Sequence, residues 1–230
     1  MENDTTKKEP DFISYIAHEL RAPLASMRWN TEMLMDGTLG EISEDQKKVL
    51  SQIHDGNKRI ADTINKLLDI VHTENGKYVI SKDDIDIVPI LNDVIIKYGK
   101  EAEEKGIIVK INSPLSYLIN FDKKSFQIIA EAFVSNCIKY SKQGGVANIF
   151  VQAGNELLLE FYDEGVGIPE DDKDKIGKEM FRASNIKNST NGTGLSLVLV
   201  NKILSLTGGA FVFTSTENEG SKFEVRIPTN

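Results

Sequence analysis

The sequence predicts two domains, an all-α helical hairpin that forms a dimeric four-helix bundle and then an α+β two-layer sandwich. In the first part of the chain, apolar residues recur at the spacing of an amphipathic helix. After Asn75 and Gly76, short strand-like runs mix with helical segments in an order that is neither regular βαβ nor all-β. With 40% hydrophobic and 27% charged residues, the composition is that of an ordinary folded protein.

The hairpin is predicted from two apolar stripes. A first helix is expected from about residue 11 to residue 35, where apolar side chains recur every seven positions. A break follows at residues 36–40, and Ser43 before Glu44 and Asp45 is a typical helix start. The stripes comprise Ile13, Leu20, Met27 and Leu34, widened by Ile16, Ala17 and Leu24, and then Ile53, Ile60 and Leu67, joined by Ile64 and Val71.

One hairpin cannot enclose both stripes, whereas two paired hairpins can. The periodicity therefore predicts a homodimer through the helical hairpin. On periodicity alone, a hairpin that does nothing except dimerise is the favoured interpretation.

The second domain is predicted to be one mixed sheet covered by helices. Asp86 and Asp122 are candidate N-caps, and Gly154-Asn155 is a hairpin-like turn. Residues 170–193 have no apolar stripe and are expected to form a mobile loop. The expected helices cover residues 87–105, 123–140 and 194–206, and the expected strands are Ile107–Ile111, Tyr117–Phe121, Val146–Ala153, Glu156–Tyr162 and two more that end at Pro228.

These patterns divide the chain into a flexible arm (1–9), a helical domain (10–73), a hinge linker (74–80) and the sandwich domain (81–230). The net charge of −8 argues against a nucleic-acid-binding surface. Cys137 is the only cysteine, which excludes an intrachain disulfide and a cysteine zinc site. Without about 20 consecutive apolar residues, no membrane contact is expected within the chain, and a cytoplasmic location is predicted.

His18 is the first candidate for chemistry. It lies about 200° around the helix from Leu20, at about 100° per residue, so its ring is expected to face water. A neutral imidazole nitrogen is a nucleophile near neutral pH, and Glu19 can hold the ring or accept the released proton. Pro23 cannot donate to the carbonyl of Glu19, which loosens the helix beside the histidine.

Three further segments carry polar groups suited to a nucleotide, although each alone is an ordinary turn or helix surface. Asn136 offers an oxygen to a metal ion, Lys139 offers a charge to phosphate, and Tyr140 offers a ring and a hydroxyl. After a strand comes the segment Asp163, Gly165, Gly167 and Ile168, in which a carboxylate can accept from an exocyclic amine and the glycines admit a flat ring.

The third segment, residues 192–195, opens a helix whose backbone amides and dipole favour phosphate. It consists of Gly192, Thr193, Gly194 and Leu195. The preceding loop contains Phe181 and Arg182, and the arginine is within reach of a γ-phosphate if it is not simply solvated.

The segment from Phe12 through His18-Glu19-Leu20-Arg21 to Pro23-Leu24 resembles the phosphoacceptor box of sensor histidine kinases. The later segments, in this order, resemble the ATP-binding domain shared by histidine kinases, DNA gyrase, Hsp90 chaperones and MutL proteins. The resemblance covers residues 12–228 and includes Gly208-Gly209 and the run from Gly220 to Pro228.

This resemblance implies an ATP-dependent autokinase that phosphorylates His18 and passes the phosphoryl group to an aspartate of a response regulator receiver domain. ATP and Mg²⁺ would be the cofactors, with Asp163 reading adenine and Asn136 binding Mg²⁺. Lys139 and Tyr140 would lie near the phosphates. Residues 170–193 would form the ATP lid.

The sequence departs from the family pattern at three positions. Ala132 replaces a second asparagine, and the neighbouring Glu131, about 100° away around the helix, is left open as a substitute. Ala22 stands where threonine or asparagine is common, and Ser196 replaces a glycine. Ala132 leaves open a second hypothesis, a nucleotide-binding dimeric scaffold with weak or no kinase activity. A gyrase-like or chaperone-like ATPase is disfavoured because those relatives do not need the histidine box.

Overall fold

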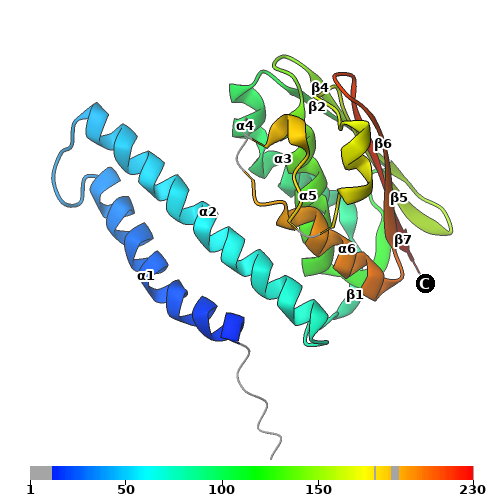
Figure 1. Cartoon of the computed structure of the whole chain (residues 1–230), viewed down its shortest axis with the longest axis horizontal. Helices are drawn as coiled ribbons and strands as arrows, with labels where there is room; N and C mark the ends of the chain where they lie inside the picture. The colour runs from blue at the N-terminus through cyan, green and yellow to red at the C-terminus, as the bar shows by residue number, and fades with distance from the viewer. Residues whose placement is uncertain (1–11, 179, 188–191, 230) are drawn as a thin grey trace, which may run out of the picture. The chain divides into compact units, whose positions relative to one another are not determined.

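The computed structural model describes residues 12–178, 180–187 and 192–229, so the predicted arm at residues 1–9 lies outside the described part. The chain divides into two compact units, Met1–Lys77 and Tyr78–Asn230 (Figure 1). The first unit is helical and the second combines helices with strands, which confirms the predicted fold class.

The first unit is an antiparallel pair of helices, α1 (Phe12–Met35) and α2 (Glu44–Glu74). Ser43 begins α2 with a reciprocal capping box: its Oγ accepts from Gln46 N at 3.2 Å, and its own N–H donates to Gln46 Oε1 at 2.8 Å. The predicted start of the second helix is therefore confirmed. Pro23 lies inside α1, which removes one N–H from the helical ladder.

The two helices bury only part of their apolar surface against each other. On α1 the buried positions are Ala17, Leu24 and Thr31, again seven residues apart. The predicted stripe beside them stays open, with Leu20 40% and Met27 46% exposed. On α2 the side chains of Ile53 and Ile60 are likewise about half exposed. As the sequence predicted, a single hairpin does not enclose both stripes.

The second unit is a two-layer α+β sandwich. Its main sheet has the order β2-β4-β5-β7-β6, with β2 parallel to β4 and the other neighbours antiparallel, and β1 pairs with β3 in a small separate sheet. The elements are β1 (Lys82–Asp86), α3 (Ile87–Lys97), α4 (Gly99–Glu104), β2 (Ile108–Asn112), β3 (Leu118–Asp122), α5 (Lys123–Tyr140), β4 (Val146–Gln152), β5 (Glu156–Asp163), α6 (Leu195–Thr207), β6 (Ala210–Thr216), β7 (Gly220–Pro228) and two 3₁₀ turns, Glu170–Lys175 and Ser184–Ile186.

The core of this unit lies between α5 and the main sheet. Phe133 of α5 is fully buried and stacks on Phe161 of β5 with ring centroids 5.1 Å apart. Its ring also meets Phe211 of β6 and Phe223 of β7 at 5.6 and 5.5 Å. Because each such aromatic pair adds about 0.5–1.5 kcal/mol beyond area burial, this cluster fixes α5 over the sheet.

Several sequence predictions for this unit are confirmed. Asp86 and Asp122 are the N-caps of α3 and α5: Asp86 accepts from Val88 N at 3.1 Å, and Asp122 accepts from Ser125 N at 2.7 Å. Gly208, with φ of 76°, closes α6 in the left-handed conformation that glycine adopts without strain.

Two expectations for this unit are wrong. The helix predicted over residues 87–105 is two helices that meet at Tyr98, where φ is −95° and ψ is 3°, before the weak helix former Gly99. Strand β1 was not expected, because four of its five residues are charged and only Ile85 is buried. The described part of the loop at residues 170–193 contains the two 3₁₀ turns.

Neither long helix is apolar all around. Among the described residues, no helix is both long and apolar enough to cross a membrane. The apolar residues of α1 and α2 lie on stripes, which is the pattern of helices that pack against other helices.

Candidate functional site

His18 is exposed on α1, as predicted from its position around the helix. Glu19 beside it is exposed too, and Pro23 follows one turn later inside the same helix. The arrangement leaves a ring nitrogen accessible to an electrophile and a carboxylate next in sequence. His18 therefore has the exposure that a phosphoacceptor needs.

The other two histidines have different surroundings. His54 is half-buried, and its Nδ1 lies 3.4 Å from Thr31 Oγ1 in the hairpin. His72 is half-buried in the last turn of α2. Of the three histidines, His18 alone is exposed.

A cavity in the second unit gathers residues from the separate sequence motifs. It is lined by the end of α5, the loop after β5, the segment at residues 176–186, the start of α6 and the start of β7. From the predicted set, the lining residues are Asn136, Lys139, Tyr140, Asp163, Gly167, Ile168, Phe181, Arg182, Gly192, Thr193 and Gly194. Gly165 and Leu195 were also predicted as binding residues, and neither lines the cavity.

Asp163 is the buried carboxyl of this cavity, with 8% of its surface exposed. Its Oδ1 accepts from Gly165 N at 3.0 Å, and Ser221 N also donates to the side chain. These hydrogen bonds favour the ionised form, but desolvation outweighs them and raises the pKa of Asp163 to about 7. The carboxyl is thus poised to titrate near neutral pH and to accept from a donor that enters the cavity.

Gly165 acts through a close approach of backbone to backbone. Val166 N donates to Tyr140 O at 3.2 Å, and Ser141 forms an isolated bridge with Gly165. A Cβ at residue 165 would collide with Tyr140 O and with the Asp163 carboxylate. Gly165 therefore joins the loop after β5 to the end of α5 without itself reaching the cavity.

The start of α6 is a site suited to an anion. Its N-cap is Gly194, with φ of 73° and no side chain of its own, and the neighbouring Thr193 Oγ1 accepts from Leu195 N at a long 3.4 Å. The Lys139 ammonium lies beside this turn, because a Cβ at Gly192 would be 2.5 Å from Lys139 Nζ. A helix N-terminus and an ammonium group therefore meet at one end of the cavity, where phosphate is favoured.

Side-chain hydrogen bonds hold the turns η1 (Glu170–Lys175) and η2 (Ser184–Ile186) to each other and η2 to the loop after β5. Asp172 Oδ2 accepts from both N and Oγ of Ser184, each at 2.7 Å. Asn185 Nδ2 donates to Gly167 O at 3.0 Å. Arg182 donates to the carbonyls of Ile186 and Lys187 at 2.8 and 3.1 Å, so here its guanidinium stabilises the η2 turn.

Both units match known protein families. Residues 10–76 match the His Kinase A (phospho-acceptor) domain, and residues 121–230 match the histidine kinase-, DNA gyrase B- and HSP90-like ATPases. The chain is 29% identical over 225 residues to an uncharacterised sensor-like histidine kinase of Rhizobium meliloti (strain 1021), covering 95% of this chain and 42% of that protein. It is 27% identical over 227 residues to the aerobic respiration control sensor protein ArcB of Escherichia coli (strain K12), covering 96% and 29%.

The chain belongs to the sensor histidine kinases. Its two matched regions are the phosphoacceptor and ATP-binding domains of a protein-histidine kinase, and the phosphoacceptor match separates it from gyrase-like ATPases. The chain spans less than half the length of the two relatives described above.

Solved structures share the fold of this kinase core. Full-length ShkA, crystallised in complex with AMPPNP, superposes with a TM-score of 0.77 at 21% identity, covering 95% of this chain and 46% of that one. The histidine kinase AdeS of Acinetobacter baumannii superposes with a TM-score of 0.63 at 20% identity, covering 93% and 98%.

Sequence reasoning missed part of the cavity of the kinase core. Ser221 and Phe223 on β7 line it, because β7 pairs with β5 so that Ser221 lies opposite Asp163 and Phe223 opposite Phe161. The alternation of side chains along β7 was the available signal in the sequence. To use it, one has to know that β7 pairs with β5. The other lining residues not singled out from the sequence as nucleotide contacts are Val166, Ile176, Gly177, Ala183, Ile186, Ser196 and Leu197.

Glu131 does not replace the asparagine missing at position 132. Its Oε1 lies 2.7 Å from Lys97 Nζ on α3 and accepts from Gln127 Nε2 at 2.9 Å. Ala132 itself is 5% exposed, and neither residue lines the cavity. In the kinase core, Asn136 is therefore the amide that α5 presents to the cavity.

The raised pKa of Asp163 predicts pH-dependent nucleotide affinity. The free protein holds the proton below about pH 7, and only the ionised carboxylate is the full acceptor for an exocyclic amine. ADP affinity should therefore rise with pH up to about 7 and level off above it, with up to about tenfold weaker binding one pH unit below the pKa. Titration calorimetry between pH 5.5 and 8.5 measures this.

Asp163→Asn is the control, because it removes this titration and leaves that of the nucleotide phosphates. The variant should bind more weakly at high pH and follow only the phosphate titration. Parallel pH profiles for the parent and Asp163→Asn would contradict the role of this carboxyl.

Proposed function

We propose that this chain transfers the γ-phosphoryl group of ATP to His18 and then to an aspartate of a response regulator receiver domain. The observation that carries the proposal is the cavity that unites Asn136, Asp163 and Gly194, three motifs far apart in sequence, in a chain that also exposes His18. With ATP as the donor, we place the reaction in the cytoplasm.

The chemistry requires little covalent work from the protein. A lone pair on the His18 imidazole forms the P–N bond as the bond from the γ-phosphorus to the β–γ bridging oxygen breaks, and ADP leaves with that oxygen. The ring then gives up a proton, for which the adjacent Glu19 carboxylate is the acceptor we propose. Positioning and charge neutralisation supply most of the rate.

We propose the contacts with ATP from the residues that line the cavity. Asp163 accepts from the adenine amine, and the amides at the start of α6 bind phosphate together with Lys139. Tyr140, Thr193, Phe181 and Arg182 complete the proposed nucleotide contacts. Residues 170–193 then form the lid. The linker at residues 74–80 is the proposed hinge that lets the γ-phosphate reach His18.

The donor groups of the cavity fit a magnesium ion that arrives with ATP. Among the described residues, no group of three or more His, Cys, Asp and Glu side chains forms a preformed metal site. Asn136 presents one neutral amide oxygen, and Mg²⁺ ordinarily combines one or two protein ligands with phosphate oxygens and waters. The bound ion would neutralise charge on the β- and γ-phosphates.

The open apolar stripe of the hairpin supports a homodimer. Leu20, Met27, Ile53 and Ile60 are 40–53% exposed in the single chain. Pairing two hairpins removes these side chains from water at about 25 cal/mol per Å² of apolar surface. The four-helix bundle is therefore the assembly we propose.

His18 should be the sole phosphoacceptor, because it is the exposed histidine beside Glu19 and Pro23. With γ-labelled ATP, the parent protein should acquire label that acid removes and alkali does not. His18→Ala should lose this label and keep its nucleotide affinity, whereas His72→Ala should still be labelled. Undiminished acid-labile label in His18→Ala would refute the mechanism.

Asn136→Ala should remove the magnesium-dependent part of ATP affinity. We expect Mg²⁺ to strengthen ATP binding by the parent and to do so by on the order of tenfold less in the variant, because the amide ligand is gone. Asp163→Asn should instead weaken ATP binding with and without Mg²⁺. Equal magnesium dependence in the parent and Asn136→Ala would show that this amide is not a ligand.

The protein should be a poor phosphatase toward its phosphorylated partner. In sensor histidine kinases, Thr or Asn at the position of Ala22 is thought to orient the water that attacks the aspartyl phosphate. Ala22 has no hydrogen-bonding group, and it is exposed one turn from His18 on the same face. Phosphotransfer from His18 should survive.

The measurement is the decay of the phosphorylated partner with added parent or Ala22→Thr protein, in the presence of ADP or ATP. We expect faster decay with Ala22→Thr than with the parent. Rapid decay with both proteins alike would contradict the prediction.

A further inference from the structure

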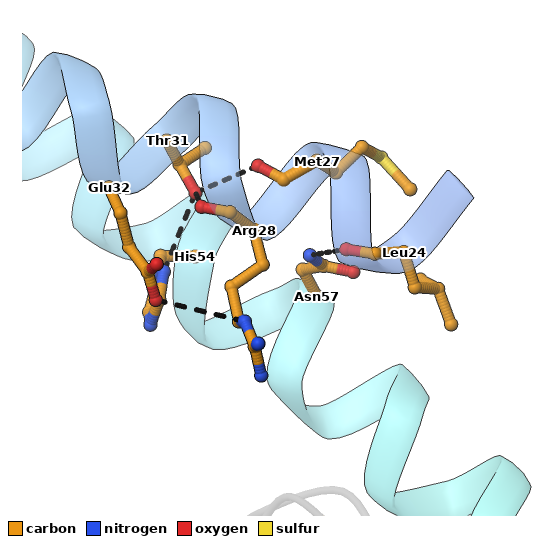
Figure 2. Close-up of polar contacts among 7 residues, drawn as sticks. All are labelled: Leu24, Met27, Arg28, Thr31, Glu32, His54 and Asn57. Carbon is orange, nitrogen blue, oxygen red and sulfur yellow. Dashed lines mark hydrogen bonds and ion pairs between the residues drawn. The ribbon is translucent and has the colours of Figure 1, made fainter. Parts of the chain in front are cut away.

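A buried asparagine joins the two helices of the hairpin. Asn57 of α2 is 6% exposed, and its Nδ2 donates to the backbone carbonyl of Leu24 on α1 at 2.8 Å (Figure 2). Leu24 is itself buried, so this hydrogen bond lies inside the seam between the helices. A direct hydrogen bond from a side chain of one helix to the backbone of the other fixes the relative position of the two helices along their axes.

A second polar contact lies one layer along the seam. Thr31 Oγ1 is within 2.9 Å of Met27 O and 2.8 Å of Arg28 O, and it is 3.4 Å from His54 Nδ1 (Figure 2). The hydroxyl has one proton, and the carbonyls of its own helix can only accept it. When that proton is donated to one of the carbonyls, the contact between Thr31 Oγ1 and His54 Nδ1 requires a proton on Nδ1.

The Asn57 contact contributes to the geometry of the hairpin rather than to its stability. Asn57 Oδ1 is buried and has no hydrogen-bond partner among the residues that the structure describes. A leucine there would bury no unpaired oxygen, so the asparagine destabilises the seam relative to an apolar residue. Buried polar residues in helix pairs are known to fix register at a cost in stability.

The position of the contact connects it to His18. Leu24 directly follows Pro23, which leaves Glu19 O without its usual donor four residues on. His18 lies six residues before Leu24, about 9 Å along the axis at about 1.5 Å per residue. The turn between them lacks one backbone hydrogen bond, and the buried residues on either side of it are Ala17 and Leu24. The Asn57 bond to Leu24 lies directly after the proline, so it fixes the height of α1 against α2 at the end of that turn.

We propose that Asn57 is a positioning residue for phosphoryl acceptance by His18, acting through the register of α1 against α2 at the Pro23 bend. The inference rests on the proposed function, because it assigns to Asn57 the placing of the His18 nucleophile. Asn57 does not contact the reacting atoms.

Kinetics and stability together test the role in the full chain. Asn57→Leu should lower kcat for autophosphorylation by on the order of tenfold or more, since small misplacements of reacting groups cost that much. The KM for ATP should stay unchanged, and the midpoint of thermal unfolding should stay equal or rise. Asn65→Leu is the matched control, because Asn65 is an exposed asparagine of α2 beside the same seam.

A distance measurement tests the register without relying on activity. Spin labels at Arg28→Cys and Lys58→Cys, in a Cys137→Ala background, report the spacing of α1 and α2, whose residues line one groove at these positions. Labelled chain is mixed with excess unlabelled chain so that each dimer carries one labelled copy. We expect a narrow distance distribution in the parent and in Asn65→Leu, and a broadened or shifted one in Asn57→Leu.

The outcomes separate this inference from the proposed function. An unchanged distance distribution in Asn57→Leu would overturn the register role, and a changed distribution with unchanged kcat would overturn the positioning role. A fall in kcat that merely follows a fall in the unfolding midpoint would also overturn it. Absence of acid-labile label in the parent would refute the proposed function, while the distances would still report on the register.

Discussion

The packing of Phe133 against the main sheet is the contact on which the cavity of the second unit depends. Phe133 stacks on Phe161, and Asn136 follows one turn later on α5 while Asp163 follows two residues later on β5. Residues two apart on a strand share a face, so Asp163 points to the same side as Phe161. The cross-strand pairs Phe161–Phe223 and Asp163–Ser221 continue the relation onto β7. One aromatic cluster thereby sets the spacing between the amide and the carboxylate.

The same packing explains the chemistry of Asp163. Its carboxyl lies at the edge of an apolar layer, and burial raises its pKa from 3.8 to about 7. Between these values the folded chain keeps a proton that the unfolded chain releases, so this group lowers the stability of the fold progressively as pH rises through that window. Asp163 costs stability when it is ionised and lies in a cavity lined by glycines and a helix N-terminus, which supports the binding role proposed for it.

The structural features that could be predicted from the sequence are those with a local signal. Helix ends depend on side chains within three residues, and Ser43, Asp86, Asp122 and Gly208 were identifiable for that reason. Strand β1 was not identifiable, because its charged residues become a strand only by pairing with β3.

The residues of the candidate site also fall into those with a local signal in the sequence and those without one. Motif residues such as Asn136, Asp163 and Gly194 were found from their own neighbours in sequence, whereas Ser221 required the pairing of β5 with β7. The Asn57 hydrogen bond to Leu24 required the register of α1 against α2, which the apolar stripes leave open. Periodicity specifies which face of a helix is buried, and it does not specify the height at which two helices meet.

In the hairpin, one set of side chains defines the internal register of the two helices, and another forms the surface proposed to pair with a second copy. Apolar packing alone would not keep these two roles apart. Its inner seam includes the small or polar side chains Ala17, Thr31 and Asn57 beside the apolar Leu24, and its outer stripe contains Leu20, Met27, Ile53 and Ile60. If both surfaces were uniformly apolar, either surface of a hairpin could pair with either surface of another copy. A shift of one helix by a heptad would then cost little free energy. In the proposed dimer, the hydrogen bonds inside the seam would give each hairpin one internal register, and the apolar stripe would supply the affinity for a second copy. The position of His18 would then be defined before the second copy arrives, and pairing would stabilise the hairpin without having to select its register.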